Sequence, residues 1–399
     1  MSLHLAAHAR WLFIALLLLL AGGGACAQTA PVLAARAWTL VDATSGVTLA
    51  ASGATQRLEP ASLTKLMTAY VVYTALGERR TGLDTSVPVS AAAVAAPGRA
   101  GARMYVEAGR PVTVDELLRG LLVASGNDAA VALAEHTAGS TSAFVERMNA
   151  EARRLGMANT RFANPTGLSD PQHYSTAEDL ARLAQRLLAD FPQYAPLYAQ
   201  REFTYNRVTL SNRNRLLWSD AGVDGLKTGH TEAAGWSIVA SASRPQGSGE
   251  RAFKRRLIAV VLGAASDSGR AQEALRLLNY GYAAFDTVQL YRQGQVLVEP
   301  EVWKGDRDSV PIGPERDIYV TVPSDALRAL GKAGLQSSLE RPDPLLAPLR
   351  KGEMVGRLKI SVGGEAVGEV PVVALESVGE AGLMGRAYDA VRLWWRRRN

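Results

Sequence analysis

Residue types that can form an activated nucleophile stand three positions apart at Ser62 and Lys65. On a helix this spacing places both side chains on one face, within reach of each other. A serine hydroxyl is unreactive at neutral pH unless a base removes its proton, and a lysine can be that base when burial or a neighbouring cation lowers its pKa. The pattern alone is weak, because a chain of this composition contains about one Ser-x-x-Lys by chance. The apolar surroundings at 63–76 make a solvated helix turn implausible.

Two further polar motifs follow along the chain. Ser125-Gly126-Asn127 lies between two predicted helices and would place a hydroxyl and a carboxamide on an exposed turn, or else it is an ordinary helix-breaking loop. Lys227-Thr228-Gly229 lies on a predicted strand, where glycine permits close backbone approach and lysine supplies positive charge. The common structural alternative is that Lys227 only prevents an edge strand from pairing with another chain.

An α/β arrangement must position these motifs. Five strands are predicted, at 37–42, 47–51, 223–231, 236–242 and 257–263. The first two are short apolar-rich runs, the third is entered through an Asp224-Gly225 turn, and the last two are dominated by β-forming residues and alanine. The stretch 63–76 is apolar on nearly every face, which is typical of a buried central helix, and a further helix is predicted at 272–282. Because strands precede and follow the helices, we expect an α/β (α+β) domain over 28–285 with a sheet assembled from both ends of that range.

Local signals divide the rest of the chain. Thr113 with Glu116, and Ser175 with Glu178, have the spacing of capping boxes that open helices. From about residue 288 the pattern changes to short alternating runs separated by Gly, Pro and Asp, which predicts a small all-β domain over 286–376. These runs are at 296–298, 318–322 and 358–362.

Together and in this order, the three motifs resemble the active-site set of the penicillin-binding protein and serine β-lactamase superfamily. The Ser-Gly-Asn form of the middle motif is similar to that of the low-molecular-mass serine D-alanyl-D-alanine carboxypeptidases, the penicillin-binding protein 5/6-like group. The flanking segments 60–68, 121–129, 162–168, 212–214 and 224–231 also resemble signature segments of that family. The resemblance runs from about Trp38 to the end of the chain. It implies a β-lactamase/transpeptidase-like domain, a small all-β domain and a C-terminal amphipathic helix.

The resemblance implies that the protein removes the terminal D-alanine from peptidoglycan stem pentapeptides and is acylated by β-lactams. Ser62 would attack the carbonyl between the last two D-alanines, and Lys65 would act as the base. Ser125 would relay the proton to the leaving amine, while Asn127 would hold the substrate amide. Lys227 would keep the site positive, so that the amine of Lys65 stays neutral.

The remaining expected contacts bind substrate. The backbone amides of Ser62 and His230 would stabilise the oxyanion, and the substrate would pair along the strand at Gly229. Thr228 and Arg213 are candidates for binding the terminal carboxylate, a group that calls for a fork of donors. An arginine flanked by two asparagines is, however, at least as often structural.

Two other functions use the same motifs. A serine β-lactamase shares the acylation step but needs a group that rapidly hydrolyses the acyl ester, usually a carboxylate that activates water. The segment 164–168, where such a glutamate is expected, contains none. A non-catalytic envelope scaffold would have no reason to keep all of the polar motif residues.

The N-terminus predicts export. Arg10 precedes an unbroken apolar run at 11–20, followed by small residues up to Ala27, which is typical of a signal peptide over 1–27. The run is too short for the roughly 20 residues of a transmembrane anchor, which is the main alternative. Lipid attachment at Cys26 is disfavoured because Gly23 stands where a large aliphatic residue is usual. We therefore expect a periplasmic protein whose mature chain begins near Gln28.

The C-terminal segment 377–399 predicts membrane attachment. Met384, Tyr388, Val391 and Trp395 recur at helical spacing on one face, with charged residues on the other. Aromatic side chains at headgroup level with arginines that reach anionic lipid are typical of an interfacial helix. We expect this helix to bind the outer face of the cytoplasmic membrane; packing against the β domain is the alternative.

Composition excludes other classes of protein. The 399 residues are 47% hydrophobic and 21% charged, which suits two globular domains. The formal net charge of +6 comes from scattered Lys and Arg, with a basic run only at 396–398, so no nucleic-acid partner is indicated. The histidines lack metal-ligand spacing and no glycine-rich phosphate loop is present, so we expect neither a metal nor another cofactor.

Overall fold

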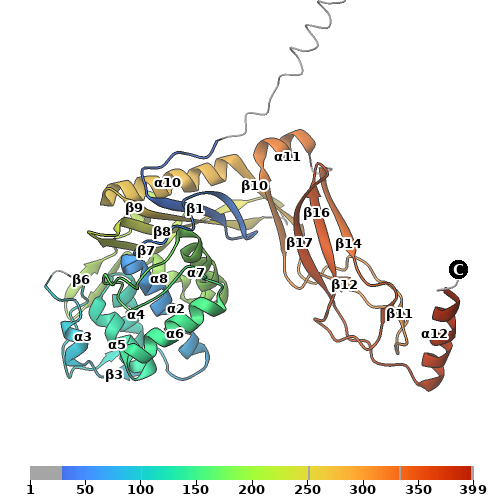
Figure 1. Ribbon diagram of the computed structural model, residues 1–399, viewed down its shortest axis with the longest axis horizontal. Coiled ribbons are helices and arrows are strands. Elements are labelled where there is room, and N and C mark those ends of the chain that lie inside the picture. The colour runs from blue at the N-terminus through green and yellow to red at the C-terminus, as the bar shows by residue number, and fades with distance from the viewer. Residues whose placement is uncertain (1–28, 100, 250–251, 332–333, 397–399) are drawn as a thin grey trace, which may run out of the picture.

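The computed structural model describes residues 29–396 apart from 100, 250–251 and 332–333. The expected signal peptide, 1–27, lies outside the described residues. Figure 1 shows two units side by side, a larger one of helices around a sheet and an elongated one of strands that follows it in the chain. We call the second, residues 285–374, the β unit.

A five-stranded antiparallel sheet forms the middle of the larger unit, in the order β2-β1-β9-β8-β7. Its strands are β1 (Ala37–Asp42), β2 (Val47–Ser52), β7 (Val223–Thr231), β8 (Gly235–Gln246) and β9 (Phe253–Ala264). All five predicted strands are therefore present, and the sheet joins both ends of the unit as expected. β8 and β9 are longer than predicted because they continue as a paired ribbon through polar residues, Arg244 opposite Arg255 among them. β7 is an edge strand, so one side of its backbone is available to a ligand.

Helices cover both faces of this sheet. Alternate sheet residues such as Val239 and Val260 pack against a helical block, whereas Ile238 and Val261 pack under α10 (Asp267–Ala284). The block consists of α2 (Lys65–Gly77), α4 (Val114–Leu122), α5 (Asn127–Ala138), α6 (Thr141–Arg154) and α7 (Ala177–Asp190). The shorter elements are β3 (Ser86–Val87), α3 (Ala91–Ala95), β4 (Val112–Thr113), α8 (Ala195–Ala199), β5 (Glu202–Tyr205), β6 (Val208–Ser211) and α9 (Leu216–Ser219). The predicted central helix is α2, which is buried on nearly every side.

One of the two predicted capping boxes is correct. Thr113 caps α4 and exchanges hydrogen bonds with Glu116 as expected. The prediction for Ser175 is wrong, because the cap of α7 is Thr176, whose hydroxyl accepts a hydrogen bond from the backbone N–H of Asp179. Ser175 instead pairs with Leu58 in an isolated β-bridge, so tertiary pairing takes precedence over the local signal.

The β unit is built from short strands around its own apolar core. The strands are β10 (Phe285–Tyr291), β11 (Val302–Trp303), β12 (Ile312–Gly313), β13 (Ile318–Pro323), β14 (Leu335–Glu340), β15 (Leu345–Leu346), β16 (Met354–Val362) and β17 (Glu365–Ala374). The runs predicted at 318–322 and 358–362 are in β13 and β16. The run at 296–298 forms only an isolated bridge between Val298 and Ile312, and the unit also contains one helix, α11 (Ser324–Leu330).

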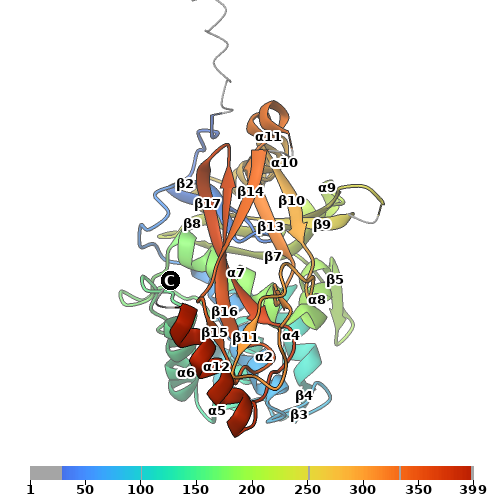
Figure 2. The ribbon, with the colours of Figure 1, turned by 90° about the vertical axis from the view of Figure 1, so that its right-hand side faces the viewer.

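The C-terminal helix α12 (Leu383–Arg396) follows the β unit and lies beside β11, as Figures 1 and 2 show. Its polar face contacts the β unit. Asp389 accepts a hydrogen bond of 2.6 Å from the backbone N–H of Lys304, and Arg392 pairs with Glu301 at 3.2 Å and lies over the ring of Trp303. Its apolar face points outward, with exposed Leu383, Met384, Tyr388, Val391, Trp394 and Trp395.

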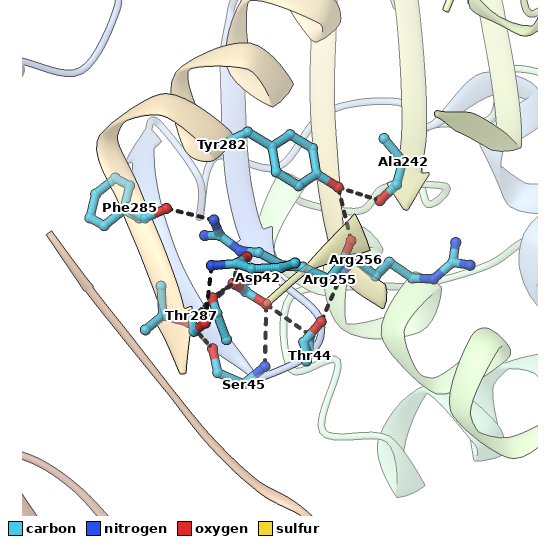
Figure 3. A network of polar contacts seen from close by, with 11 residues as sticks. Asp42, Thr44, Ser45, Ala242, Arg255, Arg256, Tyr282, Phe285 and Thr287 are labelled. Atoms are coloured by element: carbon cyan, nitrogen blue, oxygen red, sulfur yellow. Dashed lines mark hydrogen bonds and ion pairs between the residues drawn. The ribbon is translucent and has the colours of Figure 1, made fainter. Parts of the chain in front are cut away.

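A buried polar network joins the two units at Asp42 (Figure 3). Its carboxylate pairs with Arg255 of β9 at 2.8 Å and accepts hydrogen bonds from the hydroxyls of Thr287 (2.6 Å) and Thr321 (3.0 Å) in the β unit. Asp42 and Arg255 are both almost fully buried. The network also turns the chain locally, since the backbone N–H of Thr44 donates to the same carboxylate.

Replacing Asp42 with alanine is expected to lower the free energy of unfolding by about 3–5 kcal/mol, because Arg255 would remain as a buried charge without its partner. Urea unfolding followed by circular dichroism measures the effect. Asp308→Ala, which removes an exposed carboxylate from the β unit, should change stability by less than about 0.5 kcal/mol. Equal unfolding midpoints for the two variants would contradict the role given to this network.

Candidate active site

Ser62 lies in a short 3₁₀ turn, η1 (Ala61–Thr64), that leads directly into α2. Lys65 is the first residue of α2, and its Nζ is 3.0 Å from Ser62 Oγ. Lys65 is completely buried, whereas Ser62 is half-buried at the wall of a cleft. Because Ser62 is at the start of the helix, its backbone N–H has no helical acceptor and is available to a ligand. Ala61, just before it, has φ of 48°, a strained conformation of the kind that gathers at functional sites.

The hydrogen-bond partners of Lys65 suit a neutral amine. Nζ contacts the side-chain oxygen of Asn127 at 2.7 Å and the backbone oxygen of Thr166 at 2.5 Å, and both oxygens can only accept. A neutral amine has two N–H groups and one lone pair. If the two N–H groups donate to these oxygens, the lone pair faces the hydroxyl of Ser62, which is the arrangement that a general base requires.

The electrostatics of the site also favour a neutral lysine. Burial, followed by repulsion from the Arg213 guanidinium, lowers the pKa of Lys65 to about 7, although Asp128 opposes the shift. At neutral pH about half of the molecules would then carry the unprotonated amine. The cation that acts on Lys65 in addition to burial is thus Arg213, whereas Lys227 was expected to have this effect.

The Ser125-Gly126-Asn127 motif forms the turn between α4 and α5. Ser125 has φ of 62° and is nearly buried, and Asn127 is the first residue of α5. Ser125 lines the same cleft as Ser62, but among the described residues no hydrogen bond joins its hydroxyl to Lys65. Asp128, which the sequence analysis missed, holds this turn by accepting from the backbone N–H groups of Met104 and Tyr105 at 2.9 Å each.

The third motif lies on β7, opposite Ser62. A Cβ on Gly229 would come within 3.1 Å of the backbone nitrogen of Ser62, so glycine permits the close approach of β7 to η1. Lys227 is buried and donates to the backbone oxygen of Thr228 at 3.0 Å. His230 is exposed at the end of the strand and stacks on Trp236, with 3.8 Å between ring centroids.

Lys227 shares its positive surroundings with Lys65. Burial lowers the pKa of Lys227 well below its ordinary value, and repulsion from Lys65, Arg213 and Arg270 lowers it further. None of the residues that line the cleft carries a carboxylate to offset these charges. A ligand carboxylate would therefore be attracted to the cleft and would favour the charged form of Lys227.

The cleft encloses ≈ 200 Å³ and brings the predicted residues together. Seven of them line it, Ser62, Ser125, Asn127, Arg213, Thr228, Gly229 and His230. Lys65 and Lys227 are buried and are not among the residues that line the cleft. The cleft continues in two directions, past Thr166 and Leu168 into a largely apolar pocket and past Arg213 into a groove lined by arginines.

Three further residues support the site without having been predicted. Thr166 supplies an acceptor for Lys65 through its backbone, and a backbone role leaves no signal in the residue type. Arg270 of α10 reaches under β7 and donates to the backbone oxygen of Gly229 at 3.0 Å. His173 accepts from the N–H of Ala163 through Nδ1, so its Nε2 carries the proton that it donates to Thr64 at 2.7 Å.

His173 therefore ties the segment that carries Thr166 to the helix that carries Lys65. Burial lowers the pKa of His173 to about 4, so the imidazole stays neutral and keeps this tautomer at neutral pH. Its function is to position neighbouring groups, because it does not line the cleft.

Family models match both units of the chain. Residues 25–266 match a family described as D-alanyl-D-alanine carboxypeptidase, and residues 285–380 match the C-terminal domain of penicillin-binding protein 5. The D-alanyl-D-alanine carboxypeptidase DacC of Escherichia coli K12 is 39% identical over 369 residues, which are 91% of this chain and 89% of DacC. DacF of Bacillus subtilis, also named a D-alanyl-D-alanine carboxypeptidase, is 33% identical over 88% of this chain and 87% of its own.

Solved structures are similar across the same range. Penicillin-binding protein 5 of Haemophilus influenzae has a TM-score of 0.79 and 37% identity, and the match covers 88% of this chain and 99% of that one. Penicillin-binding protein D2 of Listeria monocytogenes, solved with bound cefotaxime, has a TM-score of 0.57 and 28% identity over 64% of this chain and all of its own. Because the family model matches more than half of the chain, and DacC and DacF are at least 33% identical over most of it, this protein belongs to the D-alanyl-D-alanine carboxypeptidase family.

Proposed function

We propose that this serine-type D-alanyl-D-alanine carboxypeptidase removes the terminal D-alanine of peptidoglycan stem pentapeptides through an acyl-enzyme on Ser62. The observation that carries the proposal is the environment of Lys65, a buried amine that contacts two oxygens that can only accept and, as its third neighbour, the Ser62 hydroxyl. A lysine in this setting can remove the serine proton at neutral pH.

The reaction begins with binding of the substrate's terminal carboxylate by Arg213 and Thr228, near the positive charge of Lys227. Ser62 Oγ attacks the carbonyl between the two D-alanines as its proton moves to Lys65. The oxyanion is bound by the backbone N–H groups of Ser62 and His230, on the two elements that Gly229 brings close together. Loss of one such donor typically costs about 3 kcal/mol of transition-state stabilisation.

Collapse of this intermediate breaks the peptide bond. The leaving amine takes a proton that Ser125 relays from Lys65, and D-alanine departs. Asn127 holds the amide of the remaining stem while it also accepts from Lys65. Water then attacks the ester on Ser62, with the amine of Lys65 again as base, and the serine is regenerated.

β-Lactams would acylate Ser62 by the same route, and the resulting ester would be hydrolysed slowly. The absence of a carboxylate from the described cleft lining argues against a β-lactamase, because rapid hydrolysis of the ester normally uses one. Incubation with a fluorescent penicillin and, separately, with a stem pentapeptide tests the assignment. A carboxypeptidase stays labelled and releases D-alanine; transient labelling would indicate a β-lactamase, and no labelling a scaffold.

The chain's organisation follows from the same proposal. We assign residues 28–285 to the peptidase domain, 286–376 to the C-terminal β domain and 377–399 to a membrane-binding segment, after removal of a signal peptide at 1–27. The separate apolar cores of the two units support the first boundary. We place the mature protein in the periplasm, on the outer face of the cytoplasmic membrane.

The membrane contact assigned to α12 is peripheral. The apolar side chains of this helix face outward while its polar face contacts the β unit, so the apolar face remains available to lipid. No helix in the described ranges combines the length and the apolar character needed to cross a bilayer. Insertion of tryptophan and leucine side chains at headgroup depth, with arginines near anionic lipid, suits an interfacial helix.

A chain that stops at Glu380 is expected to be active and soluble, because the truncation removes α12 but keeps the proposed site residues and Val378, which is buried in the core of the β unit. The full mature chain should sediment with anionic vesicles and be partly released by high salt, which screens the arginine contacts. Vesicle sedimentation measures both chains. A full-length chain that stays in the supernatant, or a truncated chain that sediments equally, would contradict the proposal.

A further inference from the structure

An open pocket continues from the cleft past Thr166 and Leu168, which line both. It encloses ≈ 590 Å³ between α5, the first half of α6 and the segment 163–168. Its apolar lining consists of Ala96, Val131, Val145, Ala163, Pro165 and Leu168. Among the described residues that line it, Glu146 of α6 is the one that is charged, and its exposed carboxylate forms no ion pair or hydrogen bond with the described part of the chain. The pocket thus combines an apolar wall with one uncompensated negative charge.

The wall between this pocket and Ser62 is held in place by its own contacts. The side-chain oxygen of Asn164 accepts hydrogen bonds from the backbone N–H of Gly167 and from the hydroxyl of Thr166, each at 2.8 Å, and these bonds close a turn. Gly167 has φ of 83°, and a Cβ on it would clash with the backbone oxygen of Ala61. The turn therefore lies directly against the residue that precedes Ser62, so a ligand in the pocket has a defined position relative to the reacting hydroxyl.

The pocket lies on the acyl side of the cleft. In the proposed reaction Thr228 binds the terminal carboxylate, so the rest of the stem extends along β7 towards Thr231. The hydroxyl of Thr231 donates to Glu59 at 3.4 Å, and the same carboxylate oxygen accepts from Ser169 at 2.6 Å. This bridge places the end of β7 opposite the wall of the pocket. The residue that precedes the two D-alanines therefore passes beside the mouth of the pocket.

We propose that this pocket binds the side chain of the diamino acid that precedes the two D-alanines in the stem, and that Glu146 pairs with its free ammonium group. The inference rests on the proposed function of the cleft. The side chain of a diamino acid is an aliphatic chain that ends in an amine, which matches an apolar wall followed by a carboxylate. The aliphatic part contacts Val145 and Pro165, while the ammonium group stays close to solvent at the exposed carboxylate.

This contact gives the enzyme a preference for stems whose side-chain amine is free. A cross-link formed at the diamino acid converts its amine into an amide, which removes the positive charge and attaches a second peptide. The amide cannot form an ion pair with Glu146, so the stem binds more weakly. Stems that carry the free amine are therefore trimmed faster than stems whose amine is already acylated.

D-Alanine release from two synthetic pentapeptides tests the proposal, one with lysine and one with Nε-acetyl-lysine at the third position. The wild-type enzyme should cleave the lysine peptide with a kcat/KM about two- to fivefold higher, which is the effect of one solvent-exposed ion pair. In Glu146→Gln this difference between the peptides should disappear, because the carboxylate that distinguishes them is gone.

Charge reversal separates recognition from a structural role of Glu146. The variant Glu146→Lys should cleave a pentapeptide with glutamate at the third position faster than the lysine peptide, whereas the wild type should show the opposite order. A structural role would instead slow both peptides equally. Glu315→Gln, which removes an exposed carboxylate from the β unit, is the matched control and should keep the wild-type preference for lysine.

Equal kcat/KM of the wild type for the lysine and acetyl-lysine peptides would overturn the inference and leave the carboxypeptidase function standing. A lysine preference that persists undiminished in Glu146→Gln, or an unchanged order of peptides in Glu146→Lys, would also overturn it. Failure to release D-alanine from any of the peptides would instead refute the proposed function.

Discussion

Replacing Ser62 with alanine is expected to abolish D-alanine release, with a loss of at least about 10⁴-fold in kcat/KM, because in the described part of the chain Ser62 carries the one hydroxyl that is hydrogen-bonded to the buried amine of Lys65. Covalent labelling by a fluorescent penicillin should disappear in the same variant. The fold should be unchanged, because the hydroxyl is half-buried and, among the described residues, its one side-chain partner is Lys65. D-Alanine assays and gel fluorescence measure the two losses.

Ser169→Ala is the matched control for this substitution. Ser169 lies near the cleft, but its hydroxyl donates to Glu59 at 2.6 Å and does not contact Lys65. This variant should keep nearly full activity and labelling. Labelling that survives in Ser62→Ala would place the nucleophile elsewhere and contradict the mechanism.

The second large effect is expected at Lys65, where both Lys65→Ala and Lys65→Arg should lower the acylation rate by about 10³-fold or more. Alanine removes the base. Arginine keeps the length and the charge but cannot give up its proton near neutral pH, so it cannot accept one from Ser62. Stopped-flow acylation by a chromogenic cephalosporin measures the rate, and near wild-type acylation in Lys65→Arg would show that Lys65 is only structural.

The pH dependence of acylation by the wild-type enzyme should follow the protonation of Lys65. Because the unprotonated amine is the active form and the pKa of Lys65 is lowered to about 7, acylation should rise as pH increases through about 7. Below that pH, the rate should fall tenfold per pH unit. A rate that is constant from about pH 5 to 8 would show that another group acts as base.

The sequence predicts those parts of the site whose chemistry lies in side chains at fixed local spacing. Ser62 and Lys65 are adjacent because a helical turn places them so, and β7 spans the residues predicted for it. The resemblance to a known family adds the order of the three motifs. Neither signal extends to groups that meet only after folding.

Thr166, His173 and Arg270 illustrate the difference. Thr166 acts through its backbone oxygen, and His173 and Arg270 reach the site from loops and helices far along the chain. Thr166 lies in a segment that resembles the family's signature, but neither that resemblance nor its residue type indicates a role for its backbone oxygen, and His173 and Arg270 lie in no such segment. The same limit explains the helix cap assigned to Ser175, where a strand-like bridge to Leu58 outweighs a local capping pattern.

The outward apolar face of α12 follows from periodicity, but its polar contacts do not. The pairs of Arg392 with Glu301 and Arg396 with Asp343 depend on how the β unit folds. The periodicity of the sequence predicts which residues share the apolar face of a helix, whereas the tertiary structure decides which face packs against the rest of the protein.

The central claim is that the reaction passes through an ester on Ser62, and mass spectrometry of the trapped acyl-enzyme tests it most directly. The mature enzyme, incubated with benzylpenicillin and quenched in acid, should gain the mass of one penicilloyl group, and tandem spectra of the proteolytic peptide should place that group on Ser62. Excess stem pentapeptide added beforehand should slow formation of the adduct, because both ligands compete for the same serine. An adduct on any other residue, or an unmodified protein that still releases D-alanine, would contradict the account.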